Sequence, residues 1–184
     1  MDSRAKTLKG TGESLNELIT DLKELTPKLF KEAYGDAFLV YSGLPSDLKP
    51  HDRAWHATLW GEDRVSGQQM GQALGTTLIY QIRHTERTLS KRFVTVGRLE
   101  GTNDIIINDR SISGLHAVFE QSAKGGYLVR DVGSRNGTFV GGVAVPKDST
   151  HAVRPGDSIR FGRVIVIFLD AIGLVTLAKA AAKL

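Results

Sequence analysis

The stretch SRNGTF, residues 134–139, governs the interpretation of this sequence. Asn136 and Gly137 lie between residues that favour strands, and an Asn-Gly pair in this setting is the strongest short signal of a β-hairpin. The reason is conformational, because a type I′ turn needs positive φ at both central residues. Arg135 stands directly before the turn, and hydroxyl side chains flank it, including Thr138. The stretch is therefore either a plain turn or one edge of an anion site.

Short β-rich runs surround this stretch from residue 76 onward. They are TTLIYQIRH, RFVTVGR, NDIIIND, HAVFEQ, GYLVRD, GTFVGG, DSIRF and RVIVIF, with Gly, Asp, Asn and Pro at the breaks. Many short strands with close turn signals predict an antiparallel sandwich or barrel. In such a fold the loops at one end converge, and a rigid scaffold positions the functional residues there.

A different pattern precedes residue 76. Apolar residues recur at spacings of three and four over 13–34, which predicts helix with one apolar face. Ser14 with Glu17 forms a capping-box pattern at its start. Proline at position 27 cannot sit inside a helix, so we expect a break near Thr26 and a second short helix after it. The apolar face packs on its own domain, on a second copy or on a partner.

The chain is expected to have three parts. Residues 1–75 form an N-terminal extension, with strand-like runs at 36–43 and 55–60 and no further assignable fold. Residues 76–170 form the β-sandwich. The Ala-, Leu- and Lys-rich tail at 171–184 predicts a short C-terminal helix that packs on the protein rather than on a membrane.

Composition limits the functional classes. The chain has 184 residues, 41% of them apolar, and no cysteine. Disulfides, thiolate metal sites and a cysteine nucleophile are therefore excluded, and a reducing compartment fits the composition. The N-terminus has no apolar stretch typical of a secretory signal, and the longest apolar run is too short to span a bilayer. We therefore expect a cytoplasmic, bacterial protein.

Charge and motifs narrow the classes further. The net charge is +4, and residues 91–169 carry 11 Lys and Arg against 7 Asp and Glu, hence 11 − 7 = +4. Such a surface can attract an anion, although an ordinary solvated surface is the better explanation of the charge alone. No Walker loop, nucleophile elbow, metalloprotease motif or nucleic-acid-binding motif is evident, and His51 and His56 lack metal-ligand spacing. We expect a protein that is not an enzyme and that holds no metal or cofactor.

Three of the expected loops carry residues that fit one chemical task. Arg98 follows a strand end, Ser113 and His116 stand three apart, and Arg135 and Asn136 occupy the opening turn. Each has a plain structural explanation alone. Together they suit a phosphate monoester, which carries nearly two charges and three strong acceptor oxygens. Arginine supplies a planar charged fork, hydroxyls supply small donors, and an asparagine binds peptide main chain through both donor and acceptor groups.

The ordered motifs GR, S-x-x-H and S-R-N-G-T resemble those of the forkhead-associated (FHA) domain. NDIII, DVGSRNGTFV and RPGDSIRFG support the resemblance, which covers about residues 76–169, roughly half of the chain. It implies an eleven-stranded β-sandwich that recognises phosphothreonine in an unstructured partner segment. FHA domains are among the arginine-based readers of phosphorylated motifs.

The resemblance implies roles for eight residues. The phosphopeptide-binding residues would be Arg98, Ser113, Arg135, Asn136 and Thr138. The loop-supporting residues would be Gly97, His116 and Gly137. Two positions depart from the family pattern, because Gly114 stands where Arg, Lys or Asn is frequent and Gly141 stands where Asn is common. The first departure removes a donor, for which Arg135 can compensate.

Two hypotheses follow. The first is a phosphothreonine-binding adaptor in signalling downstream of a Ser/Thr kinase, with a phosphorylated protein, the kinase or its substrate as partner, and with no nucleic acid or membrane involved. The second is a phosphate-independent scaffold that uses the same sandwich and forms homo-oligomers through the helix at 13–34.

Overall fold

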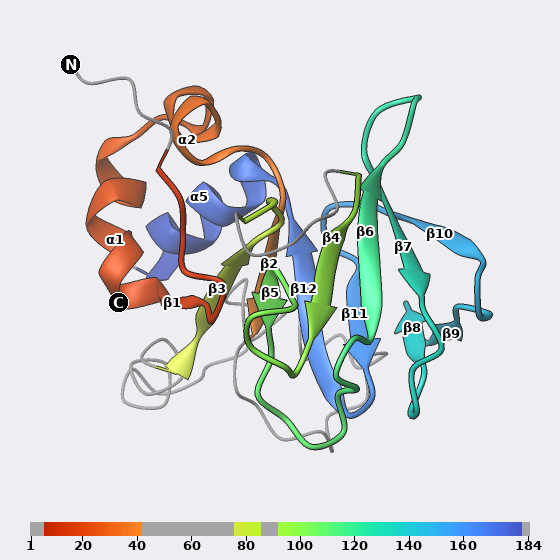
Figure 1. Ribbon diagram of the computed structural model, residues 1–184. Coiled ribbons are helices and arrows are strands. Elements are labelled where there is room, and N and C mark those ends of the chain that lie inside the picture. Colours follow the sequence, from red (N-terminus) through yellow and green to blue (C-terminus); the bar gives the residue numbers. More distant parts are fainter. Residues whose placement is uncertain (1–5, 42–75, 86–91, 182–184) are drawn as a thin grey trace.

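The computed structural model describes residues 6–41, 76–85 and 92–181. Two β-sheets lie face to face, and three helices cover the outer side of one of them (Figure 1). The predicted mainly β sandwich, with helices near both ends of the chain, is therefore confirmed. Within the described ranges, no helix is long and apolar enough to cross a membrane.

The larger sheet has seven strands in the order β1-β3-β2-β12-β11-β8-β9, and all neighbours are antiparallel. Its strands are β1 (Glu13–Ser14), β2 (Phe38–Tyr41), β3 (Leu78–Gln81), β8 (Thr138–Val140), β9 (Val143–Ala144), β11 (Ser158–Phe161) and β12 (Val164–Leu169). Leu39 of β2 pairs with Tyr80 on one side and with Phe168 on the other. A segment from before residue 76 thus forms an inner strand of the sheet.

The smaller sheet has five strands in the order β10-β7-β6-β4-β5. Its strands are β4 (Val94–Gly97), β5 (Ile105–Ile106), β6 (Ala117–Gln121), β7 (Tyr127–Asp131) and β10 (Thr150–Val153). All pairings are antiparallel except β4 with β5, which is parallel. The described ranges thus hold twelve strands, close to the predicted eleven.

Strand β12 shows how the layers share the apolar residues. Val164, Val166 and Phe168 point into the core between the sheets. Ile167 and Leu169 point the other way, into a second core beneath the helices. Alternation along a strand sends successive side chains to opposite faces, so a strand buried on both faces reads as a continuous apolar run. The run VIVIFL is therefore a strand between two apolar layers.

Two short helices lie in the range 13–34, for which the sequence predicted a helical pattern with a break. Helix α1 (Leu15–Glu24) begins at the predicted capping box, in which the Ser14 amide donates to Glu17 and the Glu17 amide donates to the Ser14 hydroxyl. Thr26 caps helix α2 (Pro27–Tyr34), and its Oγ1 accepts from the Leu29 amide. The predicted break near Thr26 is confirmed, because proline at the first position of a helix loses no hydrogen bond.

Helix α5 (Ala171–Ala181) completes the helical layer and contacts α1 and α2 (Figure 1). Leu15, Leu18 and Leu22 of α1 lie in the second core together with Leu174 of α5. The apolar face on which self-association was predicted is therefore covered by the chain's own helix and sheet. This burial removes the observation that favoured a homo-oligomer through 13–34.

The two strands predicted before residue 76 and the domain boundary at residue 76 can also be compared with the structure. The strand predicted at 36–43 is confirmed by β2, whereas the one at 55–60 lies outside the described residues. The division at residue 76 stays a prediction, and the large sheet takes strands from both sides of it.

Candidate functional site

The predicted binding residues lie in loops at one end of the sandwich, the lower end in Figure 1. The loop after β4 carries Arg98, the loop before β6 carries Ser113, and the loop between β7 and β8 carries Arg135 and Asn136. The hairpin between β11 and β12 reaches the same end, because the Gly162 amide donates to the Gly137 carbonyl over 3.0 Å. The fold therefore brings the predicted loops together.

Main-chain hydrogen bonds hold Arg98 beside Ser113. The Arg98 amide donates to the Ser113 carbonyl over 3.0 Å, and the Leu99 amide donates to the Gly114 carbonyl over 3.3 Å. The Arg98 side chain is exposed, and its Nε donates to the Ile112 carbonyl in a long bond of 3.4 Å. Its two terminal amino groups donate to no described residue. The charged fork at the strand end thus keeps donors for a ligand.

The Ser113 hydroxyl is oriented by the neighbouring loop. Its Oγ accepts a hydrogen bond of 3.0 Å from the Arg135 amide. A hydroxyl has one proton and two lone pairs, so an acceptor bond leaves its proton for donation. Ser113 is half-buried and Arg135 is exposed. The hydroxyl can therefore donate to an anion that Arg98 or Arg135 reaches with its guanidinium.

His116 connects two of the loops from inside the protein. The residue is fully buried, and its Nδ1 accepts from the Ser113 amide over 3.1 Å. Its Nε2 lies 3.2 Å from the Gly137 carbonyl, which can only accept, so Nε2 carries the proton. Burial lowers the pKa of His116 below its usual value of 6.5, although the Gly137 carbonyl and Asp131 oppose the shift. A neutral imidazole is thus an internal clamp between loops, as predicted.

Asn136 is tethered at the outer edge of the site. Its side chain is exposed, and Nδ2 donates to the Ser111 carbonyl over 2.8 Å. Its Oδ1 accepts from no described residue. Gly137 follows with φ of +77°, a conformation that glycine adopts without strain. The turn therefore presents an amide oxygen at a defined place, where an extended peptide could donate a main-chain N–H.

Thr138 lies elsewhere than predicted. The residue is fully buried, and its Oγ1 donates to Asp131 Oδ2 over 2.8 Å. The other flanking hydroxyl, Ser134, also donates to Oδ2, over 2.6 Å. Both hydroxyls therefore point into the protein rather than toward a ligand. The predicted binding role of Thr138 is corrected to a supporting one, because no surface of the residue is available to a peptide.

Asp131 is the support that the sequence analysis missed. This buried carboxylate accepts from the amides of Gly133 and Ser134 at 2.8 Å, besides the two hydroxyls. Burial raises the pKa of Asp131, but the hydrogen bonds from Ser134, Thr138 and Gly133 outweigh it, and the pKa is lowered from its usual value of 3.8. An aspartate followed by Gly and Ser two and three residues later was the available signal, since such side chains accept from nearby amides.

Gly97 is needed for close packing. An added Cβ would lie 2.1 Å from the Gly114 carbonyl oxygen and 2.7 Å from the amide of Asn103. Asn103, also missed, is buried, and its Nδ2 donates to the carbonyls of Leu99 at 2.8 Å and Gly114 at 2.7 Å. Only glycine leaves room for this buried amide, so the predicted supporting role of Gly97 agrees with the geometry.

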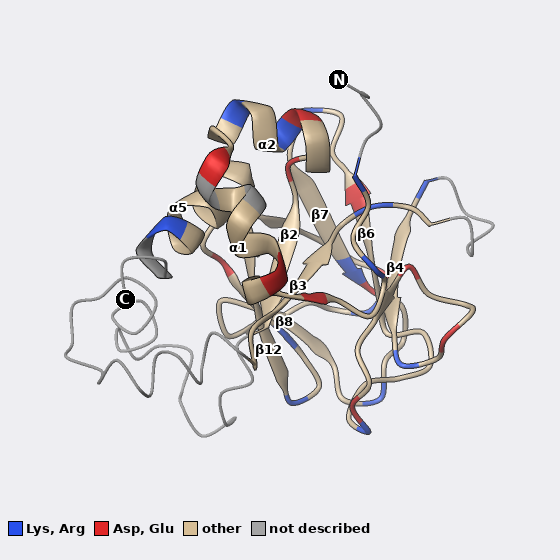
Figure 2. Ribbon diagram, turned by 90° about the vertical axis from the view of Figure 1, so that its left-hand side faces the viewer, with Lys and Arg blue, Asp and Glu red and all other residues tan. Residues whose placement is uncertain are grey.

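The loop end is positively charged. Three exposed arginines, Arg98, Arg110 and Arg135, face one exposed acidic residue, Glu100. Arg163 forms an ion pair of 3.0 Å with Asp109, so the charges of these two side chains cancel. Figure 2 shows basic and acidic residues along this lower end. The excess of cations favours an anionic ligand.

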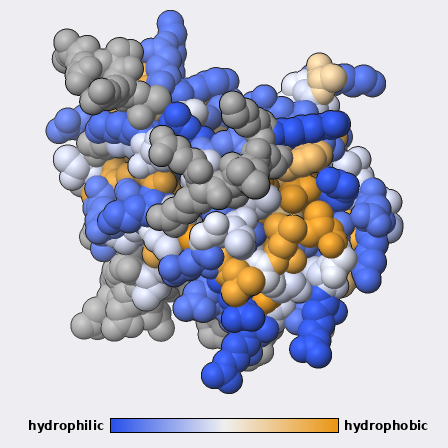
Figure 3. Space-filling view, viewed as in Figure 1, coloured by the Kyte–Doolittle hydropathy of each residue, from blue (hydrophilic) through white to orange (hydrophobic). Residues whose placement is uncertain are grey.

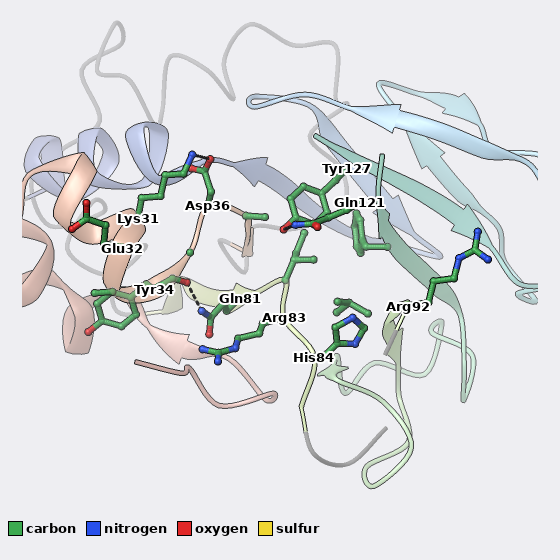
Figure 4. Close-up of a pocket in the computed structure, with 16 residues that line it drawn as sticks. Lys31, Glu32, Tyr34, Asp36, Gln81, Arg83, His84, Arg92, Gln121 and Tyr127 are labelled. Carbon is green, nitrogen blue, oxygen red and sulfur yellow. Dashed lines mark hydrogen bonds and ion pairs between the residues drawn. The ribbon is translucent and has the colours of Figure 1, made fainter. Parts of the chain in front are cut away.

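A hollow lies at the other end of the sandwich. This cavity of about 470 Å³ is lined by residues in and next to α2, β3, β4, β6 and β7, including Lys31, Arg83, His84 and Phe119. Figure 4 shows Lys31 turned to Asp36 and the Gln81 amide turned to the Tyr34 carbonyl. None of the predicted site residues lines this cavity. The candidate site is instead an open surface formed by loops, as suits an extended segment of a protein.

Comparison with known families agrees with this arrangement. The family model of the FHA domain matches residues 94–162, which run from the start of β4 to the hairpin after β11. Residues 94–162 are therefore an FHA domain. All of the predicted site residues fall within the matched FHA segment. An FHA domain is a binding module for phosphorylated motifs rather than an enzyme.

Two curated relatives come from Arabidopsis thaliana. A protein phosphatase 1 regulatory inhibitor subunit homolog is 27% identical over 128 residues, which are 70% of this chain and 34% of that protein. An FHA domain-containing protein is 32% identical over 77 residues, 42% of this chain and 20% of that protein. The chain thus spans about a third or less of these relatives. The predicted bacterial origin stays a prediction.

Two solved FHA domains are each similar to slightly less than half of the chain. The MEK1 FHA domain in complex with a HOP1 phosphothreonine peptide is 26% identical and covers 44% of this chain and 82% of that one, with a TM-score of 0.38. The FHA-2 domain of a Mycobacterium tuberculosis ABC transporter is 32% identical and covers 48% of this chain and 77% of that one, with a TM-score of 0.38.

Proposed function

We propose that this protein binds phosphothreonine peptides through the loop end of its FHA domain and acts as an adaptor downstream of a Ser/Thr kinase. Its partner is a phosphorylated protein, either the kinase or a kinase substrate. FHA domains read phosphorylated motifs with arginine clusters. The proposal concerns this loop end and assigns no role to the rest of the longer relatives.

One observation carries the proposal. Arg98 and Ser113, from separate loops, are joined through their main chains, while the guanidinium fork and the hydroxyl proton keep unused donor capacity. A phosphate offers three strong acceptor oxygens and nearly two negative charges. Charge-assisted hydrogen bonds contribute about 1.5–3 kcal/mol each. Two such bonds would make the phosphate decisive for a peptide that is otherwise weakly held.

Preorganisation strengthens this argument. Buried hydrogen bonds hold the three loops from the protein interior, and they are made by His116, Asp131 and Asn103. A site whose loops are already ordered loses less conformational entropy when it binds. The Asn136 amide adds a place for the peptide main chain next to the phosphate. The arrangement therefore suits an extended segment with a phosphorylated side chain better than a free small anion.

The alternative is a phosphate-independent scaffold. Gly114 favours this alternative, because it brings no side-chain donor next to Ser113, where the family frequently has one. A scaffold would bind its partner equally with and without phosphate. It would also tolerate the loss of Arg98.

A peptide pair separates the two functions. A fluorescent phosphothreonine peptide and its unphosphorylated twin are titrated with the full chain and followed by fluorescence anisotropy. We expect binding of the phosphorylated peptide only, and an affinity lower by about tenfold to a hundredfold for Arg98→Ala, since one or two charge-assisted bonds are lost. Arg154→Ala is the matched control, because this exposed arginine lies in the turn between β10 and β11, at the other end of the sandwich. Equal binding of both peptides would refute the proposal.

A further inference from the structure

The cavity at the end of the sandwich opposite the loops opens onto the core between the two sheets. Its buried lining residues include Ala37, Ile82, Val94 and Phe119, which all belong to that core. Protein cores rarely leave voids larger than a water molecule, whereas small-molecule sites have volumes of about 300–1,000 Å³. The volume of this cavity, about 470 Å³, lies in the second range. The hollow can therefore hold a small organic molecule whose apolar part contacts the core.

The cavity is separate from the candidate phosphate site. Strand β4 begins at the cavity with Val94 and ends with Gly97, next to Arg98. Strand β7 begins there with Tyr127 and ends with Asp131, the buried support of the third loop. The two places thus lie at opposite ends of the same strands, and a ligand in the cavity does not compete with a phosphopeptide for space.

Polar groups around the hollow keep donor capacity. The Tyr127 hydroxyl accepts a hydrogen bond of 3.3 Å from the Gln121 amide, which leaves its own proton for another acceptor. His84 Nδ1 is buried and has no hydrogen-bond partner among the described residues. The exposed Arg83 guanidinium donates to the Thr7 hydroxyl over 3.0 Å through one amino group, and it has further N–H groups. These groups suit a ligand that is rich in acceptors.

Ion pairs account for most of the charges that line the cavity. The pairs are Lys31 with Asp36 and Arg92 with Glu120. The acidic Glu32 is exposed, and Figure 4 shows its carboxylate turned away from the hollow. Arg83 is the remaining cation of the lining, and it stands next to His84 in the chain. The charge that a ligand meets here is therefore positive, which favours an anion.

We infer that this cavity binds a small organic carboxylate with an aromatic or branched apolar body. The body lies against Phe119 and Val94, and the carboxylate accepts from Arg83, with the His84 ring and the Tyr127 hydroxyl as further donors. The planar fork of an arginine matches the two oxygens of a carboxylate. The inference goes beyond the proposed phosphothreonine binding and does not depend on it.

A matched series of probes tests this inference. The probes are phenylacetate, the neutral phenylacetamide, the cationic phenethylamine and acetate, which lacks the ring. Each is titrated into the ¹⁵N-labelled full chain and followed by two-dimensional NMR. We expect phenylacetate to bind about tenfold more tightly than phenylacetamide, because it alone makes a charge-assisted hydrogen bond, and more tightly than the other two probes. The shifts should centre on the amides of Ala37, Ile82 and Phe119, with a change in the ring resonances of His84.

Protein variants assign the binding to the cavity. Arg83→Gln should lower the affinity for phenylacetate about tenfold and leave that for phenylacetamide unchanged, and Tyr127→Phe should lower the first affinity by less. Arg110→Gln is the matched control, because it removes the same charge from an exposed arginine at the loop end, and it should keep the preference for phenylacetate. Figure 3 shows hydrophobic patches on a largely hydrophilic surface, which the ring of a probe can also contact, so the position of the shifts is part of the test.

The outcomes decide the inference without reference to the phosphate site. Absence of phenylacetate binding, equal affinities for phenylacetate and phenylacetamide, or binding of acetate as tight as that of phenylacetate would overturn it. A preference for phenylacetate that survives in Arg83→Gln, or shifts centred outside the cavity, would overturn it as well. The proposed function is measured with the phosphopeptide pair, and each of these results leaves it standing.

Discussion

Removal of the Asp131 carboxylate should destabilise the protein more than the loss of any ordinary surface charge. Four donors meet this side chain at 2.6–2.8 Å: the amides of Gly133 and Ser134 and the hydroxyls of Ser134 and Thr138. A hydrogen bond to a charged group contributes about 1.5–3 kcal/mol, and an unsatisfied buried donor costs about 1–3 kcal/mol. Simple addition overestimates the effect, because the loop relaxes and neighbouring bonds are coupled.

We expect Asp131→Ala to lower the free energy of unfolding by about 3–4 kcal/mol, a large part of the stability of an ordinary domain. Asp131→Asn should cost about 2 kcal/mol, because one oxygen remains as an acceptor while the amide nitrogen faces donors. Urea unfolding followed by circular dichroism measures both values, with Glu100→Ala as an exposed control. A loss below about 1 kcal/mol for the alanine variant would refute the reasoning.

The pH dependence gives an independent check. The folded pKa of Asp131 is lowered, so the stability from this group is present above the unfolded pKa of about 3.9 and is lost as the pH falls through the folded pKa. Asp131→Asn should therefore show a shallower loss of stability below about pH 4 than the unmodified chain. If the two proteins lost stability equally steeply below about pH 4, Asp131 would not be the ionised carboxylate that holds the loop.

Three further outcomes follow from the supporting residues. The unmodified chain should lose stability as the pH falls below 6.5, because burial lowers the pKa of His116 in the folded state and the unfolded chain therefore binds the proton first. His116→Gln should remove this loss, as urea unfolding across pH 5–8 would show. Gly97→Ala should lower the free energy of unfolding by about 3 kcal/mol or more, because its Cβ would clash with Gly114 and Asn103. Gly114→Ala should lower it by less than about 1 kcal/mol, because its Cβ would meet only the exposed side chain of Leu99. Thermal unfolding compares the two variants. Gly114→Asn should bind the phosphothreonine peptide more tightly, as anisotropy would show, since it adds a side-chain donor next to Ser113.

Local signals predicted the elements that depend on neighbouring residues. The capping pattern at Ser14 and the proline after Thr26 placed both N-terminal helices, because caps and proline act within one turn. The Asn-Gly pair predicted a β-hairpin, and this was wrong: β7 and β8 lie in different sheets, and Gly137 has a positive φ but Asn136 does not, so the pair lies in a connection between the sheets. The order of the three loop motifs indicated a common site, and the fold brings these loops to one end of the sandwich.

Contacts between residues far apart in the sequence could not be predicted from local patterns. The pairing of β2 with β12 joins Leu39 to Phe168, and no pattern along the chain specifies a partner so distant. The two-residue strands β1 and β9 are too short to show alternation. Thr138 seemed a surface donor because a hydroxyl beside a turn looks the same whether it faces solvent or a buried carboxylate. Asp131 and Asn103 support the loops through bonds that only the folded chain makes.

The central claim is that the loops at residues 98, 113 and 136 together bind a phosphothreonine peptide. The most direct measurement is a titration of the ¹⁵N-labelled full chain with the phosphorylated peptide, followed by two-dimensional NMR. We predict shifts confined to the amides of Arg98, Ser113 and Arg135, the side-chain amide of Asn136 and their neighbours, and none with the unphosphorylated peptide. Shifts centred on the cavity beside Lys31 and His84, or shifts that do not depend on the phosphate, would contradict the claim.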